Sequence, residues 1–465
     1  MHFIKLAIFA AFALEIALVA IASDAAKLVI TVLSQYPGYH TAKAYRLRDN
    51  IKEQAKDLQD VSVNIILTHE LNLVGSWTIG NILPDLIRNF EESQWYLFCE
   101  VNTFIKLKRL MDLLRGFNSS QVQKDIWLGY AVYDHEPTII HHFSDHTKKF
   151  KYPNPSSGFV ITAPLVKKLA QRVASGEKPE GEFSIDAAYE FSKFVWDNGK
   201  GTRLIHVPEL CVVSDDTCAT YPQHFHPCGQ SIPIQKVYVA VKTCSKFHVQ
   251  RISVIKRTWA KHAANIGYYS DKADDNIPEA IVTPNTTQGH CAKTYSILKH
   301  SNEILTSKKL DWLVITDDDT ILSLGKLLQL LTCYNPSDPV ALGERYGFRL
   351  WKNSGYNYLT GGAGLVLSAN LVQKLIEPGF CSCPSPSTPD DMFLFGVCLK
   401  RVGTEPIHLP HFHQARPDDY PKVYLASQEP VSFHKFWQID PKQVYDEWFA
   451  EADAYLSPPV QHTEL

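Results

Sequence analysis

Three consecutive carboxylates, Asp317, Asp318 and Asp319, have the type and spacing best suited to chemistry, and they follow the mostly apolar run 312–316. That run predicts a buried strand, so the acids lie at the carboxyl end of a strand, where open α/β sheets bind ligands. Adjacent carboxylates repel one another, and a hard divalent cation such as Mn²⁺ or Mg²⁺, shared with substrate phosphates, would offset that repulsion. In an extended chain Asp317 and Asp319 point to the same side. We therefore expect both to hold a metal ion and Asp318 to line the same donor-binding edge; the alternative is a helix cap.

Further motifs supply candidate partners for the acids. Gly361 and Gly362 lie in a Thr-Gly-Gly-Ala-Gly run before another apolar strand, and glycines let a backbone approach a ligand closely. Asp390 is expected to cap the helix that follows it, which leaves Asp391 as a free carboxylate. His413 could complete a metal shell, because imidazole suits Mn²⁺-type sites beside carboxylates. The alternatives are a plain glycine turn and a solvated histidine, one of 19 in the chain.

The elements that must position these residues occur twice along the chain. Each half shows an opening apolar strand, a helical stretch, a strand that begins with tryptophan, and an amphipathic helix. Alternating strands and helices predict a mainly parallel sheet covered by helices on both faces, so the expected fold is two tandem Rossmann-like α/β domains. The matching segments are 95–98 with 312–315, 104–114 with 322–331, 158–163 with 364–369, and 205–208 with 407–410. We predict domains at 27–213 and 236–455, joined by a polar, proline-containing linker at 214–235.

The first half serves as an internal control for the chemistry. It has Glu100, Val101 and Asn102 where the second half has its three acids, and Ala187 where the second half has Asp391. A Pro-Ser-Ser run replaces the glycines. We therefore expect a noncatalytic first domain that supports the second domain or grips a folded acceptor.

The composition and the chain ends indicate a compartment. There are 46 Lys plus Arg against 49 Asp plus Glu, so the net charge of −3 excludes a strongly basic nucleic-acid-binding protein. Residues 1–22 resemble a signal peptide, with a type II membrane anchor as the alternative. The tail 456–465 ends in His-Thr-Glu-Leu, which resembles an endoplasmic-reticulum retention signal. We expect a resident of the endoplasmic-reticulum lumen without stable membrane insertion.

Cysteines and sequons fit that compartment. The ten cysteines predict disulfides, although their spacing does not give the pairing. The Cys381-Ser-Cys383 motif could be taken for a metal pair, but it lacks the second Cys/His pair of a zinc site. Asn118 and Asn285 begin glycosylation sequons.

Together the motifs of the second half resemble the Fringe-like β1,3-glycosyltransferases, most strongly over about residues 236–440. The motifs that carry the resemblance are the run 239–251, Trp259, the acids 317–319, the glycines of 360–364, the Pro-Asp-Asp of 389–391 and Phe412-His413. The resemblance implies a GT-A fold, UDP-glucose as donor, Mn²⁺ as cofactor (Mg²⁺ as an alternative), and O-linked fucose on thrombospondin type 1 repeats as acceptor. The tandem first half and the tail fit the glucose-transferring branch better than Fringe itself, which has one such domain and a membrane anchor.

The resemblance also implies roles for single residues. Asp319, with Asp317, and His413 would bind the metal; Asp391 would be the catalytic base; and Thr243 and Arg251 would line the nucleotide pocket. The segment 414–420 departs from the Fringe pattern, so acceptor contacts are not implied. Two other functions stay open: a family member that transfers N-acetylglucosamine or galactose, and a noncatalytic lumenal protein that binds glycans or acts like a chaperone.

Overall fold

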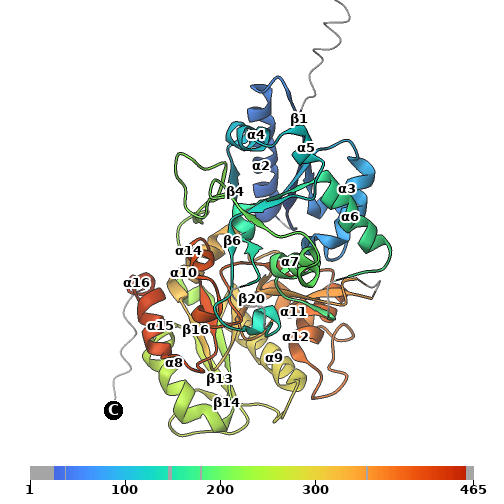
Figure 1. Ribbon diagram of the computed structural model, residues 1–465. Helices are drawn as coiled ribbons and strands as arrows, with labels where there is room; N and C mark the ends of the chain where they lie inside the picture. The colour runs from blue at the N-terminus through green and yellow to red at the C-terminus, as the bar shows by residue number, and fades with distance from the viewer. Residues whose placement is uncertain (1–25, 37, 145–148, 179–180, 352–353, 457–465) are drawn as a thin grey trace, which may run out of the picture.

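The computed structural model describes residues 26–36, 38–144, 149–178, 181–351 and 354–456, and it shows two halves, each built on its own sheet (Figure 1). The expected signal peptide and retention-type tail lie outside these residues. Within the described ranges, no helix is long and apolar enough to cross a membrane.

The first half, blue to green in Figure 1, contains a six-stranded sheet in the order β10-β5-β8-β3-β1-β2. The central strand β3 (Trp95–Glu100) pairs in parallel with β1 (Ala26–Leu33) and antiparallel with β8 (Phe159–Thr162). The outer strands are β2 (Val61–Leu67), β5 (Trp127–Gly129) and β10 (Ile205–His206).

The second half contains a seven-stranded sheet in the order β14-β13-β12-β15-β20-β17-β21. Its central strand β15 (Trp312–Asp317) pairs in parallel with β12 (Val237–Lys242) and antiparallel with β20 (Leu365–Ser368). The outer strands are β13 (Ile266–Ser270), β14 (Ala280–Val282), β17 (Ala341–Gly343) and β21 (Ile407–His408).

The strand registers confirm the internal repeat. Trp95 pairs with Leu28 and Thr162, and its counterpart Trp312 pairs with Val237 and Ser368. The two sheets therefore have the same strand order from β2 to β10 and from β13 to β21, apart from the extra edge strand β14. The predicted fold class, two tandem α/β domains with mainly parallel sheets, is confirmed.

In both halves the strand side chains alternate between two apolar cores. Leu28, Ile30 and Leu97 pack under α2 and α4, whereas Val29 and Tyr96 face α3 and α6. The same alternation in the second half separates the core under α8 and α10 from the core under α9 and α11. The covering helices are α2 (Tyr39–Lys56), α3 (Leu83–Asn89), α4 (Leu107–Arg115), α6 (Ala163–Ala174), α8 (Ser253–Arg257), α9 (Cys291–Lys308), α10 (Leu324–Leu330) and α11 (Ala369–Ile376).

The prediction that a helix follows each central strand was wrong in one detail, because a short strand comes first. After β15, β16 (Thr320–Leu322) pairs antiparallel with β22 (Ser432–His434). After β3, β4 (Thr103–Ile105) pairs antiparallel with β11 (Thr220–Pro222), which lies inside the predicted linker. The β-branched residues of both short strands favour extended backbone over helix.

The two halves also share a small sheet. Strand β9 (Phe183–Ser184) of the first half pairs antiparallel with β18 (Arg345–Phe348) of the second, and β18 pairs with β19 (Tyr356–Leu359). The remaining elements are α5 (Ser119–Val122), β6 (Ala131–Val132), β7 (Tyr152–Pro153), α7 (Ala187–Trp196), α12 (Asp390–Met392), α13 (Leu399–Arg401), α14 (Lys422–Ala426), α15 (Pro441–Trp448) and α16 (Ala450–Asp453), with short 3-10 and π turns between them.

Four disulfides form among the ten cysteines, as the sequence predicted. The two cysteines of the Cys381-Ser-Cys383 motif belong to different disulfides, so this motif is not a metal pair. Cys99 and Cys244 are free. Such a set of disulfides is typical of proteins that fold in an oxidising compartment. The pairs are Cys211–Cys218, Cys228–Cys333, Cys291–Cys383 and Cys381–Cys398.

The disulfides differ in the length of chain that they close, which gives a matched stability test. Cys228–Cys333 spans 105 residues and Cys211–Cys218 spans 7. Chain-entropy arguments give roughly 4.7 kcal/mol for a loop of about 100 residues and roughly 2.4 kcal/mol for one of about seven. We expect the double serine variant of the long-loop pair to lower the calorimetric unfolding temperature more than that of the short-loop pair. Equal losses would contradict this explanation.

Candidate active site

The edge of the second sheet brings two of the three acids together with a histidine. One ligand atom from each of Asp317, Asp319 and His434 lies within 4.8 Å of the others. His434 Nε2 is 3.2 Å from Asp319 Oδ1 and 3.8 Å from Asp317 Oδ2. The pairing of β16 with β22 creates this cluster, because Thr320 lies directly opposite His434. Two carboxylates and one imidazole form a donor set that could hold a divalent ion such as Mn²⁺.

The backbone orients the His434 ring toward the acids. Its Nδ1 lies 3.1 Å from the carbonyl oxygen of Gln414. A carbonyl oxygen can only accept, so Nδ1 carries a proton, and Nε2 is the ring atom that faces the two acids. This is the usual support for a metal-binding histidine.

His434, and not the predicted His413, lies beside the acids. Both ring nitrogens of His413 already have partners: Nε2 is 2.8 Å from Gln428 Oε1, and Nδ1 is 3.2 Å from the carbonyl oxygen of Ser432. Burial lowers the pKa of His413 to about 4, which keeps the ring neutral. Its segment runs beside β22, and its ring packs against β22 and Tyr420 rather than facing the acids.

Arg251 and Thr243, both predicted to line the nucleotide pocket, contact the middle acid. Arg251 NH1 is 2.6 Å from Asp318 and 3.1 Å from Asp319, and Thr243 Oγ1 donates to Asp318 Oδ2 over 2.7 Å. Burial raises the pKa of Asp318. Burial also acts to raise the pKa of Asp319, but the hydrogen bond from His434 and the charge of Arg251 outweigh it, so this pKa is lowered. Asp319 is therefore ionised at neutral pH.

A lysine that the sequence did not single out connects the remaining acids. Lys242 Nζ is 3.1 Å from both Asp317 and Asp390. Burial acts to lower the pKa of Lys242, but the charges of these two acids outweigh it and raise the pKa. The prediction that Asp390 caps a helix was wrong: it is the first residue of α12, and its Oδ2 accepts hydrogen bonds from Lys242 and Thr294. The corresponding Asp186 of the first half does cap its helix.

Asp391 has the environment of a general base. It is half-buried, and its Oδ1 accepts from the backbone N–H of Met392 over 2.8 Å. Burial, followed by the charge of Asp390, raises the pKa of Asp391 to about 6. A carboxylate with a pKa near neutrality can take a proton from a hydroxyl group in the transition state.

The glycine run 360–364 allows a close approach to the backbone, as expected, but the group that approaches is a side chain of the protein, the His434 ring. A Cβ atom on Gly362 would lie 2.3 Å from His434 Cε1, so only glycine leaves room for the imidazole ring. At Gly361 the nearest atom to such a Cβ is Lys242 Nζ at 3.8 Å. Thr320 fixes the run by donating to the carbonyl oxygen of Gly362 over 2.9 Å.

The first half keeps Glu100 in place of Asp317 and Asp186 in place of Asp390, but it lacks the counterparts of Lys242 and His434. Leu33 pairs with Glu100 where Lys242 pairs with Asp317, and Pro222 lies opposite Thr103 where His434 lies opposite Thr320. The only other cluster of metal-ligand type among the described residues contains Cys211 and Cys218, which a disulfide already joins. The sequon residues Asn118 and Asn285 are exposed.

The fold and the site together are those of one class of enzyme, the Fringe-like glycosyltransferases. The acid and histidine cluster lies at the carboxyl edge of a mostly parallel sheet, and a separate carboxylate with a raised pKa lies nearby. The profile of the Fringe-like glycosyltransferase family matches residues 232–454, which contain the cluster and its partners.

Known relatives cover both halves. A mouse β-1,3-glucosyltransferase is 44% identical over 441 residues, covering 92% of this chain and 88% of the mouse protein. The human β-1,3-glucosyltransferase is 42% identical over 437 residues, covering 92% and 86%. A zebrafish manic fringe β-1,3-N-acetylglucosaminyltransferase is 26% identical over 225 residues, covering 42% of this chain and 62% of its own. The chain therefore belongs to the β-1,3-glucosyltransferase family of Fringe-like enzymes.

The two glycines give a matched test of the cluster. We expect Gly362→Ala to displace the His434 ring, because the added methyl group would overlap it, and to weaken binding of Mn²⁺ by at least about tenfold. Gly361→Ala should leave the affinity unchanged, since its methyl group meets only the end of Lys242. Titration calorimetry with Mn²⁺ measures both. Equal affinities in the two variants would exclude His434 as a ligand.

Proposed function

We propose that the protein is an inverting transferase that moves glucose from UDP-glucose to the 3-hydroxyl of O-linked fucose on thrombospondin type 1 repeats. The observation that carries the proposal is the separation of two kinds of carboxylate in the second half. Asp317 and Asp319 face His434, whereas Asp391 stands apart with a raised pKa. Identity to the glucosyltransferases along both halves supports glucose as the donor sugar.

In the proposed reaction, each group of site residues has a separate role. Asp391 takes the proton of the attacking hydroxyl group as the new bond forms at the anomeric carbon of glucose. Asp317, Asp319 and His434 would hold a Mn²⁺ ion, whose charge would stabilise the departing diphosphate. Arg251 and Thr243 hold Asp318 by hydrogen bonds, and in this proposal both line the nucleotide site. The first half takes no part in bond formation.

Two alternatives are less well supported. Transfer of N-acetylglucosamine fits the manic fringe relative, but that match spans only 42% of this chain. A galactose donor has no observation in its favour. A glycan-binding or chaperone-like protein without chemistry would not need a raised pKa at Asp391. The proposed location is the lumen of the endoplasmic reticulum, where the disulfides and the exposed sequons fit.

The role of Asp391 predicts a defined loss and a defined pH profile. Asp391→Asn should lower turnover by about 10²–10⁴-fold and leave UDP binding nearly unchanged, because general-base catalysis has that magnitude. The base works only when ionised, and its pKa is about 6, so turnover of the unaltered enzyme should fall as the pH drops through that value. Asp418→Asn, at an exposed carboxylate, is the control. Normal turnover in Asp391→Asn would refute the assignment.

The role of Asp319 predicts loss of metal-dependent donor binding. In the full chain, Asp319→Ala should abolish the Mn²⁺-dependent part of UDP affinity and all transfer, because the part of the first half that the structure describes has no equivalent cluster. The assay uses a panel of UDP-sugars with fucosylated thrombospondin and EGF-like repeats as acceptors. Transfer of another sugar in preference to glucose, or transfer to EGF-like repeats alone, would overturn the proposed substrates. Residual transfer by Asp319→Ala would mean that residues outside this cluster carry out the reaction.

A further inference from the structure

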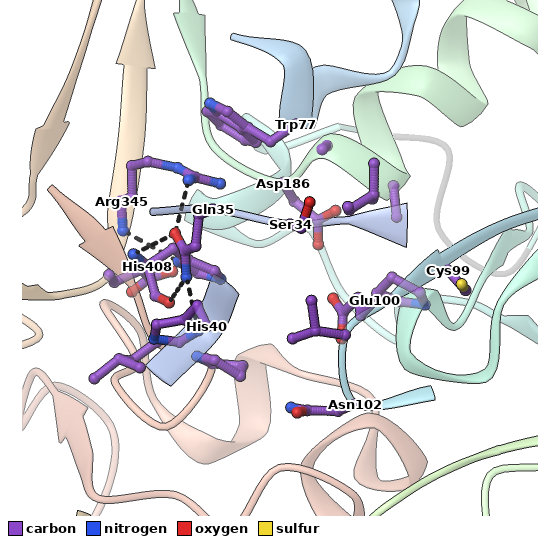
Figure 2. Close-up of a pocket in the computed structure, with 18 of the residues that line it drawn as sticks. Ser34, Gln35, His40, Trp77, Cys99, Glu100, Asn102, Asp186, Arg345 and His408 are labelled. Atoms are coloured by element: carbon purple, nitrogen blue, oxygen red, sulfur yellow. Dashed lines mark hydrogen bonds between the residues drawn. The ribbon is translucent and has the colours of Figure 1, made fainter. Parts of the chain in front are cut away.

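A cavity of about 150 Å³ lies between the two halves and is partly open to solvent. Figure 2 shows residues that line it. Residues that follow β1 and β3 and residues at the start of α7 form one side of it. The second half closes the other side with Glu344, Arg345 and the segment 408–411. A cavity of this size can hold several waters or a small organic molecule.

The cavity occupies the position in the first half that the acid cluster occupies in the second. Glu100 and Asn102 end β3 as Asp317 and Asp319 end β15, and Ala187 stands in place of Asp391. The first half therefore keeps the sheet edge that binds ligands in open α/β folds. It does not keep the charged groups that would suit a metal ion and a diphosphate.

A network of hydrogen bonds across the interface preforms the walls. Gln35 Nε2 donates to the carbonyl oxygen of His408 over 2.7 Å, and Gln35 Oε1 accepts from Arg345 NH1 over 3.1 Å (Figure 2). His40 Nε2 lies 2.8 Å from the hydroxyl group of Tyr334. These bonds join the halves, so a ligand would enter a cavity that already has its shape.

Two buried nitrogen atoms on the walls have no hydrogen-bond partner among the described residues. His411 is 7% exposed, and its Nδ1 is buried without a hydrogen bond; Arg345 Nε is in the same state. Asn102 and Glu100 also line the cavity and are half-buried; Asn102 accepts from Lys43 through its oxygen, and Glu100 accepts from Ser156 through Oε2. Buried polar groups are normally paired, so the two buried nitrogens of His411 and Arg345 indicate a ligand that supplies hydrogen-bonding groups, such as hydroxyls.

The charges of the cavity are balanced and largely neutralised. Burial lowers the pKa of His40 and of His411 to about 3 and raises the pKa of Glu344 to about 8, so all three are uncharged at neutral pH. Asp186 faces His141 at 3.3 Å, and this buried ring lies between two carboxylates that raise its pKa to about 9 in spite of burial. Lys43 lies between Asn102 and the charge of Glu100. Arg345, whose pKa burial lowers to about 9, stays cationic at neutral pH, and the acidic Glu100 and Asp186 line the same cavity. With Arg345 and Lys43 set against these two acids, neither a metal ion nor a phosphate finds an excess of opposite charge.

Apolar side chains complete the lining, among them Trp77, Phe98 and Phe159. Apolar walls with a few converging polar groups are typical of small-molecule sites. A pyranose has this same mixture, an apolar C–H face and a rim of hydroxyl groups. We propose that this cavity, in the noncatalytic half, is a second carbohydrate site that binds one neutral pyranose unit, free or at the end of a glycan, without nucleotide or metal.

The test is a titration of the intact chain with methyl β-D-glucopyranoside and methyl α-L-fucopyranoside by saturation-transfer NMR, in the presence of Mn²⁺ and UDP. We expect saturable binding of at least one glycoside with a Kd of about millimolar, corresponding to roughly −4 kcal/mol, and the same Kd in Asp319→Ala. Ala187→Phe fills the cavity and should weaken binding more than tenfold, whereas Ala187→Ser should not. Asn102→Ala, which removes the amide without adding bulk, should also weaken it and serves as the second variant if Ala187→Phe unfolds.

Three results would overturn the proposal. One is the absence of saturable binding at tens of millimolar of either glycoside. Another is binding that UDP displaces or that Asp319→Ala removes, because the sugar would then lie in the second half. The third is displacement of the glycoside by inorganic phosphate at lower concentration, which would make the cavity an anion site. The proposal does not depend on the substrates proposed above, since a different donor sugar would leave all these outcomes unchanged.

Discussion

Repulsion among the carboxylates at the end of β15 is the constraint that decides which side chains surround this strand end in the second half. Asp317, Asp318 and Asp319 are adjacent in the chain, and each is balanced by a group from a different element. Lys242 comes from β12, Arg251 from the turn before α8, and His434 from β22. Like charges at such distances in a partly buried site would oppose folding if they were uncompensated. The architecture around β15 therefore serves to deliver three cationic or hydrogen-bonding groups to one strand end.

The comparison between the two halves separates what the fold needs from what the chemistry needs. Both halves keep the tryptophan that begins the central strand, the register of the strands around it and the short strand that follows. The first half replaces Lys242 by Leu33 and His434 by Pro222, and it folds the same way without them. Apolar alternation on the strands is therefore sufficient for the architecture. The charged groups are additions that cost desolvation, and they are present only where a ligand can repay that cost.

Much of this could be predicted from the sequence, because it depends on local pattern. The repeat, the sheets and the position of the acids follow from apolar runs and from the ends of strands. The prediction of His413 as a metal ligand failed for a reason that no local pattern contains. His434 reaches the acids only because β16 pairs with β22, a strand far along the chain, and a short strand of three residues gives little periodic signal. Lys242 was missed because a single lysine at a strand end becomes informative only once its register with Asp317 is known.

The support of His434 connects the site with the interface between the two halves. The carbonyl oxygen of Gln414 orients the His434 ring, and the backbone N–H of Gln414 donates to Glu344. Glu344 precedes Arg345, which binds Gln35 of the first half. A metal-binding histidine depends on the groups that fix its ring, so the interface residues form part of the outer layer of the site. Among its described residues the first half has no equivalent cluster, but it contacts Arg345 and His408, which lie beside the residues that position the histidine of the second half.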